Sequence, residues 1–171
     1  MPFVDHIRPL VLLAVNTGMR RGELFNLTWD DVNLTRASLT VRGGGAKSGQ
    51  TRHIPLNDEA VTILRGWWGL TETGAGLVFP SRDGGRLDNI NSAWAGVLKR
   101  ADITGFRFHD LRHTFASWLV MAGTDLYVVR DLLGHASIQQ TERYAHLAPE
   151  VKARAVAGLV APGHGGQVDA Q

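Results

Sequence analysis

Residues 108–117, FHDLRHTFAS, place the strongest constraint on what this chain can form. Four apolar residues recur there and just beyond at helical spacing, namely Leu111, Phe115, Trp118 and Leu119. This periodicity predicts a helix that runs to about residue 122 and turns Leu111, Phe115 and Leu119 to the core. His109 and Arg112 stand three residues apart, so the helix stacks them on one face, which we expect to face an open basic groove. A histidine beside a fork-shaped cation suits a phosphate oxygen, although a buried helix with a satisfied polar edge fits the pattern equally well.

The composition bounds the class of protein. A chain of 171 residues with 44% hydrophobic residues fits one domain with a sizeable core. It has no apolar run of membrane-spanning length and no secretory signal. The absence of cysteine excludes disulfides, Cys-ligated zinc and a thiol nucleophile, and it suits a cytoplasmic protein. The net charge is only +2, but just three of the 18 cationic residues are lysines, and arginine pairs bidentately with phosphate.

The order of the segments indicates a mainly helical α+β domain over residues 1–160. Helices are predicted at residues 3–17, 21–27, 57–68, 89–101, 108–122, 126–133 and 137–144, and a last one starts at Pro149. Residues 38–42 and 51–56 alternate as strands around a glycine-rich turn, which predicts a hairpin and one small antiparallel sheet. Residues 161–171 are rich in Gly, Pro, Gln and Asp, so we expect a disordered tail.

Two further cations lie where a turn would present them. Arg20 follows Gly18, which is suited to a left-handed turn, so it falls in a tight connection between two helices. Glu23 lies three residues later and could hold the Arg20 guanidinium by a charge-assisted hydrogen bond. Lys47 comes just after the glycine turn of the hairpin, where it could reach a neighbouring groove and carry a proton or serve only solubility.

Five blocks of the sequence, taken together, resemble the catalytic boxes of the tyrosine recombinases, also called the phage integrase family. The blocks are TGMRRGEL at 17–24, the hairpin lysine Lys47 before TRHIPL at 51–56, HDLRHTFA at 109–116, LLGH at 132–135, and TERYAH at 141–146. Order and spacing agree over roughly residues 5–155, and none of the six key positions departs from the pattern. The resemblance implies a tyrosine-recombinase catalytic fold, which is a DNA breaking-rejoining fold with a small antiparallel sheet.

The same resemblance implies site-specific DNA recombination, as integration or excision, through a 3′-phosphotyrosyl intermediate. Its implied catalytic residues are Arg20, Lys47, His109, Arg112, His135 and the nucleophile Tyr144. The two arginines would clamp the non-bridging oxygens and His135 would hydrogen-bond the phosphate. His109 would take the tyrosine proton, and Lys47 would protonate the leaving 5′-oxygen. Glu23 and Asp110 would orient the arginine and the histidine.

No cofactor, ATP or metal is expected, since the arginines supply the charge and His109, His113 and His135 lack accompanying zinc ligands. The expected partner is double-stranded DNA carrying an attachment site. A full-length enzyme would act as a homotetramer on DNA. An N-terminal core-binding domain is absent from this sequence, so we expect a fragment that is monomeric alone. Two alternatives remain open: a type IB topoisomerase-like enzyme that relaxes DNA, and a catalytically idle DNA-binding remnant.

Overall fold

The computed structural model describes residues 6–43, 51–71, 76–148 and 156–157. Its helices are α1 (Ile7–Thr17), α2 (Arg21–Asn26), η1 (Trp29–Asp31), α3 (Asp58–Thr71), α4 (Asn91–Arg100), α5 (Asp110–Met121), α6 (Leu126–Leu133), α7 (Gln139–Glu142) and η2 (Ala145–Leu147). Its strands are β1 (Val32–Asn33), β2 (Ser38–Val41) and β3 (Arg52–Pro55). The predicted mainly helical α+β class with one small antiparallel sheet is confirmed. None of the helices in these ranges combines the length and apolar character that crossing a membrane needs.

The three strands form an antiparallel sheet in the order β1-β2-β3. Leu39 pairs with Ile54, and both are almost fully buried because the alternation of the strands turns them to the core. The hairpin of β2 and β3 lies where the sequence predicts it. The short strand β1 was not predicted, because two residues are too few to show an alternating pattern.

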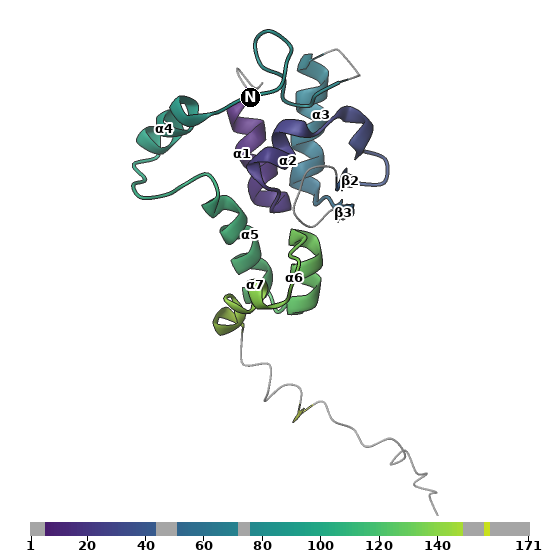
Figure 1. Ribbon diagram of the computed structural model, residues 1–171, viewed down its shortest axis with the longest axis vertical. Helices are drawn as coiled ribbons and strands as arrows, with labels where there is room; N and C mark the ends of the chain where they lie inside the picture. Colours follow the sequence, from purple (N-terminus) through teal and green to yellow (C-terminus); the bar gives the residue numbers. More distant parts are fainter. Residues whose placement is uncertain (1–5, 44–50, 72–75, 149–155, 158–171) are drawn as a thin grey trace, which may run out of the picture.

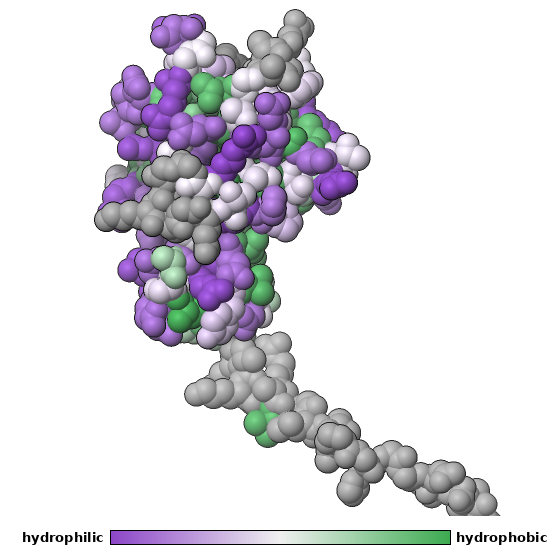
Figure 2. Space-filling model, turned by 45° about the vertical axis from the view of Figure 1, so that its right-hand side comes forward, coloured by the Kyte–Doolittle hydropathy of each residue, from purple (hydrophilic) through white to green (hydrophobic). Residues whose placement is uncertain are grey.

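The helices pack in two groups joined by α5. Helix α1 contacts both α3 and α5, and these contacts place it at the centre of the larger apolar core. A second, smaller core lies between α5, α6 and the segment around Tyr144. Figure 1 shows this arrangement, with α1–α3 and the sheet grouped together and α6 and α7 at the far end of α5. In the face shown in Figure 2, mostly hydrophilic residues cover the described surface, with scattered apolar ones.

Two predicted segments differ from the structure in detail. On α5, Leu111 is buried and Phe115 and Leu119 are partly buried, as expected, whereas Trp118 at the same helical spacing is 55% exposed. Trp118 directly precedes Leu119, and neighbouring helical positions point about 100° apart, so both cannot face one core. The helix predicted over residues 137–144 is shorter in the structure, where α7 ends at Glu142, and the separate 3-10 helix η2 begins after Tyr144. The helix expected from Pro149 begins outside the described residues.

Candidate active site

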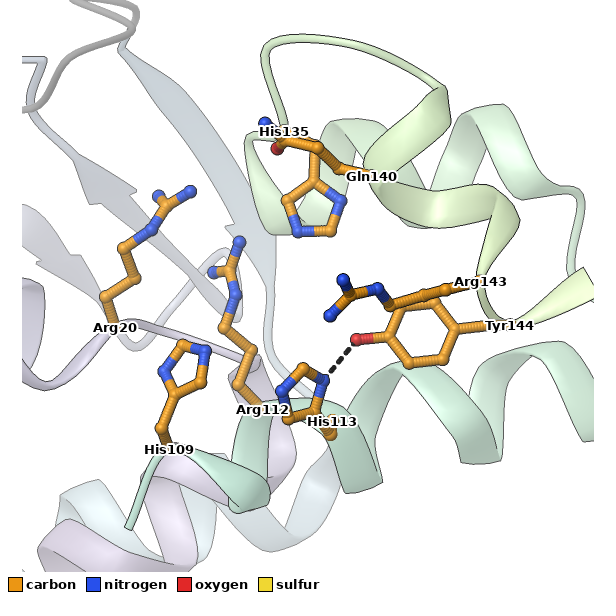
Figure 3. Close-up of a pocket in the computed structure, with 8 residues that line it drawn as sticks. All are labelled: Arg20, His109, Arg112, His113, His135, Gln140, Arg143 and Tyr144. Atoms are coloured by element: carbon orange, nitrogen blue, oxygen red, sulfur yellow. Dashed lines mark hydrogen bonds between the residues drawn. The ribbon is translucent and has the colours of Figure 1, made fainter. Parts of the chain in front are cut away.

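A pocket of about 330 Å³ collects five of the six predicted catalytic residues. Figure 3 shows its lining, which consists of Arg20, His109, Arg112, His113, His135, Gln140, Arg143 and Tyr144. These side chains come from four separate parts of the chain: the turn before α2, the start of α5, the turn after α6, and α7 with the residues after it. Lys47 lies outside the described residues, so its place relative to this pocket stays a prediction.

Arg20 is aimed by the turn between α1 and α2. Gly18 ends α1 in the left-handed conformation, with φ 63°, as its position in the sequence predicts. Arg20 then forms the N-cap of α2 in an extended conformation. Glu23 holds it twice, because the Oε2 atom accepts from the Arg20 backbone N–H at 2.8 Å and Oε1 accepts from the guanidinium at 3.0 Å. The predicted Arg20–Glu23 pair is therefore present.

Glu23 also binds a second arginine from the sheet. Arg52 on β3 donates to both carboxylate oxygens of Glu23, at 3.0 and 2.6 Å, and its Nε donates to the Leu132 carbonyl at 3.0 Å. Burial raises the pKa of the Glu23 carboxyl, but the bonds from Arg52 and then Arg20 outweigh it and hold the pKa below its ordinary value. Glu23 thus ties Arg20 to the hairpin, and Arg52 ties the hairpin to the end of α6.

Arg112 is more enclosed than the sequence suggests. We expected it to face an open groove, yet the residue is 4% exposed because two carbonyl groups draw its guanidinium inward. Those of Gly18 and Leu133 accept from its two terminal nitrogens at 2.7 and 2.6 Å. Burial, and then the charge of Arg20, lower the pKa of Arg112 to about 9, so it stays charged at neutral pH. Three of its five N–H donors remain for a ligand in the pocket.

His135 is presented by the turn that ends α6. Gly134 takes the left-handed conformation with φ 63°, and the His135 backbone N–H then bonds back to the Arg130 carbonyl at 3.1 Å. The Nδ1 atom lies 2.8 Å from the hydroxyl of the buried Thr141. Burial, followed by the charges of the surrounding arginines, lowers the pKa of His135 to about 4. The ring is therefore neutral at pH 7, and one of its nitrogens is tied to Thr141.

Tyr144 is paired with a histidine that the sequence reasoning did not select. Its hydroxyl lies 2.5 Å from Nδ1 of His113, one turn after His109 on α5 (Figure 3). Burial raises the pKa of the Tyr144 phenol, although the charges of Arg143 and Arg112 oppose this. Burial lowers the pKa of His113, so the neutral ring can accept a hydrogen bond from the protonated phenol. The sequence signal that could have pointed to His113 was the second histidine of the His-Asp-Leu-Arg-His segment.

His109 lies beside this pair rather than on it. Its ring contacts that of His113 edge to face, with ring centroids 5.1 Å apart. Burial, and then the charge of His113, lower the pKa of His109. Asp110, expected to orient the histidine, instead accepts from Arg107, through the backbone N–H at 2.8 Å and the guanidinium at 3.0 Å. The carboxylate thus caps the turn that begins α5, and Asp110 is not among the residues that line the pocket.

Three other neighbours of the predicted residues were missed by sequence reasoning, namely Arg52, Gln140 and Arg143. Gln140 precedes Tyr144 by four residues, so one turn of helical periodicity could have placed it beside the tyrosine, whereas Arg143 directly precedes Tyr144 and no periodicity aims it at the pocket. No sequence signal links Arg52 to Glu23. Within the ranges that the structure covers, no group of three or more His, Asp or Glu side chains is placed to hold a metal ion.

The geometry agrees with comparisons to known proteins. Residues 5–150 match the phage integrase family. The integrase of Salmonella phage P22 is 37% identical over 155 residues, which cover 85% of this chain and 40% of that protein. Tyrosine recombinase XerD of Mycobacterium tuberculosis is 37% identical over 154 residues, which cover 84% of this chain and 48% of that protein.

Solved structures give the same answer for the fold. The catalytic domain of bacteriophage HP1 integrase superposes with a TM-score of 0.65 at 30% identity, and the match covers 88% of this chain and 80% of that one. The chain therefore spans a little under half the length of the two curated relatives, but most of the isolated catalytic domain. Residues 5–150 identify this chain as a member of the phage integrase family.

Proposed function

We propose that this chain is the catalytic part of a site-specific recombinase that cuts and rejoins double-stranded DNA through a 3′-phosphotyrosyl intermediate. The observation that carries the proposal is the convergence of the Tyr144 hydroxyl with Arg20, Arg112 and His135 on one small pocket. A nucleophile beside a base, with fixed cations around the reacting group, is the arrangement that phosphoryl transfer requires.

In the cleavage step, the Tyr144 oxygen attacks the phosphorus and its proton passes to Nδ1 of His113. The bond from phosphorus to the 5′-oxygen breaks, and that oxygen takes up a proton to become the free 5′-hydroxyl. Lys47 is the proposed donor of this proton. Rejoining runs the same steps backwards, with His113 returning the proton to the phenol. The phosphotyrosyl bond conserves the energy of the phosphodiester, so the cycle calls for no ATP.

The cations act on the phosphate rather than on the nucleophile. Arg20 and Arg112 each use two nitrogens on protein acceptors and keep further N–H groups for the non-bridging oxygens. His135 is neutral, and in the tautomer protonated at Nε2 it donates a hydrogen bond to the phosphate through Nε2 while Nδ1 accepts from the Thr141 hydroxyl. His109 lines the same pocket and is proposed to donate a further hydrogen bond to the phosphate.

The proposed substrate is a double-stranded attachment site, and the proposed active assembly of the longer enzyme is a homotetramer on DNA in the cytoplasm. The names of the relatives, an integrase and a tyrosine recombinase, support recombination and do not favour topoisomerase-like relaxation. An idle remnant is disfavoured because Tyr144 and both arginines are retained in one pocket.

A nicked suicide duplex carrying the flanking sequence of the native element tests the proposal. Cleavage releases a short strand that cannot rejoin, so a covalent protein–DNA adduct accumulates and is seen on a denaturing gel. The adduct is expected to persist in EDTA and to disappear in Tyr144→Phe. Tyr127→Phe is the matched control, because Tyr127 is the other tyrosine of the chain and is 57% exposed. An adduct that survives Tyr144→Phe contradicts the assignment.

A further inference from the structure

A second cleft, of about 650 Å³, adjoins the catalytic pocket. Arg20 and His109 line both hollows, so the two share part of their wall. The rest of its wall comes from the start of α2, from α4, and from the loop between α4 and α5. The predicted catalytic boxes assign no role to α4 or to that loop.

The apolar wall of this cleft consists of aromatic rings in a fixed arrangement. Trp94 on α4 meets Phe108 edge to face, with ring centroids 5.5 Å apart, and lies 6.2 Å from the ring of Phe106. Its indole N–H donates to the Phe106 carbonyl at 3.3 Å, which fixes the plane of the ring. Trp94 and Phe106 are only partly buried, so they offer apolar surface to a ligand. In a duplex the bases are paired and stacked, so this wall suits the deoxyribose ring of a nucleoside or a base that has left the stack.

The polar rim of the cleft is cationic. Arg21 and Arg107 line it and are exposed, and none of the described residues that line it is acidic. Arg107 is steadied by its ion pair with Asp110 at 3.0 Å. Gly22 also lines the cleft, and a Cβ atom there would have no neighbour within 4 Å, so the space beside α2 is open. Arginine at such a rim selects a phosphate.

We propose that this aromatic cleft binds the nucleoside unit next to the scissile phosphodiester, with its outer phosphate on Arg21 and Arg107. The inference rests on the proposed function, because the scissile phosphate must occupy the catalytic pocket beside it. Adjacent phosphates of one strand are joined through one nucleoside, and the two hollows join through Arg20 and His109. The cleft thereby fixes the register of the strand on the nucleophile, which a single phosphate in a small polar pocket does not.

Thymidine 3′,5′-bisphosphate is the probe, since it carries one nucleoside between two phosphates, and inorganic phosphate is the reference ligand. Isothermal titration with the 171-residue chain is expected to give a Kd for the bisphosphate about tenfold or more below that of inorganic phosphate. Arg21→Gln and Trp94→Leu should each weaken the bisphosphate about fivefold or more, in keeping with the loss of one phosphate contact or one stacking contact. Neither variant should change the Kd of inorganic phosphate.

Arg65→Gln on α3 and Trp118→Leu on α5 are the matched controls, because both residues are exposed and lie outside the two hollows. Circular dichroism verifies folding, and Arg21→Gln, at an exposed position, keeps the test valid if Trp94→Leu unfolds. The proposed cleft is contradicted if the bisphosphate binds no more tightly than inorganic phosphate, or if Arg21→Gln leaves the Kd of the bisphosphate unchanged. Failure of the suicide duplex to form a Tyr144 adduct, with bisphosphate binding intact, would instead count against the proposed recombination.

Discussion

The hydroxyl of Tyr144 and the Nδ1 atom of His113 are 2.5 Å apart, although the two residues lie 31 positions apart in the chain. Two helical segments, α5 and the turn between α7 and η2, bring them together over the smaller apolar core. The His-x-x-Arg pattern draws attention to His109, but the hydrogen bond to the proposed nucleophile belongs to the histidine one turn later. Substitution of each histidine in turn can therefore test which of the two rings takes the proton of Tyr144.

Replacement of His113 by Ala is expected to slow formation of the covalent adduct by about 10²-fold or more, because the phenol loses its proton acceptor. His109→Ala should cost less, and His146→Ala, at an exposed position in η2, should cost nothing. Single-turnover cleavage of the suicide duplex measures all three. If His109→Ala instead slowed adduct formation by about 10²-fold and His113→Ala did not slow it, His109 would be the base.

Protonation of His113 should also cause the cleavage rate to fall at low pH. Since burial lowers its pKa below the ordinary 6.5, the ring stays neutral at pH 7 and becomes protonated only under more acidic conditions. The rate is therefore expected to be flat near neutrality and to fall only at a pH below the ordinary histidine pKa of 6.5. In His113→Ala the residual rate should not show this fall. A fall at an unchanged pH in that variant would show that another group titrates.

His135 makes the stability of the fold depend on pH. Its pKa is about 4 in the folded protein and 6.5 when unperturbed, so the unfolded chain binds more protons between these values. The free energy of unfolding must then fall as pH drops from about 6.5 to about 4, by about 1–3 kcal/mol after allowance for partial exposure. Thermal unfolding between pH 7 and pH 5 measures this.

His135→Gln keeps a hydrogen-bonding group near Thr141 but removes the titration, so its Tm should change less over the same pH range. His53→Gln, at an exposed position on β3, serves as the control and should keep the slope of the native chain. Equal slopes for all three proteins would mean that His135 does not carry the effect.

Local patterns predicted the parts of the fold that local physics decides. The bounds of α6, Leu126–Leu133, follow from an Asp125 cap at one end and Gly134 at the other, and the structure has both. Five site residues could be named because each stands in a short, recognisable block. That these residues lie in one pocket could be predicted only from the resemblance, since no periodicity brings residues 20, 112 and 144 together.

The missed features depend on contacts between distant segments. The Glu23–Arg52 pair joins residues 29 apart, and it became visible only when β3 was placed against α2. The sequence predicts that Arg112 faces an open groove. In the structure its guanidinium is buried instead, because it donates to two carbonyl groups, one from the turn after α1 and one from the end of α6. Such burial of a charge requires partners that no neighbouring residue supplies.

The Glu23 network predicts a large difference between two acidic residues. Glu23→Gln removes the charge that two arginines share, and it leaves Arg52, whose side chain is 11% exposed, without an ion-pair partner. We expect a loss of about 2–4 kcal/mol of unfolding free energy. Asp110→Asn breaks the exposed pair with Arg107 and should cost less than about 1 kcal/mol. Urea unfolding at pH 7 compares the two, and similar losses would contradict a structural role for the network.

Two glycines around Arg20 provide the last comparison. Gly18 has φ 63°, and a Cβ atom there would collide with the Phe115 ring and lie 2.9 Å from Leu133. Gly18→Ala should therefore cost about 2–4 kcal/mol, from backbone strain and overpacking together. Because the Gly18 carbonyl accepts from Arg112, cleavage should also slow in the molecules that remain folded.

Gly22 differs in both respects, since it lies within α2 and a Cβ atom there would meet nothing within 4 Å. Gly22→Ala should leave stability unchanged or raise it by up to about 1 kcal/mol, because alanine loses less backbone entropy in a helix. Chemical unfolding and single-turnover cleavage of both variants separate the two effects. A Gly18→Ala protein as stable and as active as the native chain would show that the turn does not set the position of the arginines.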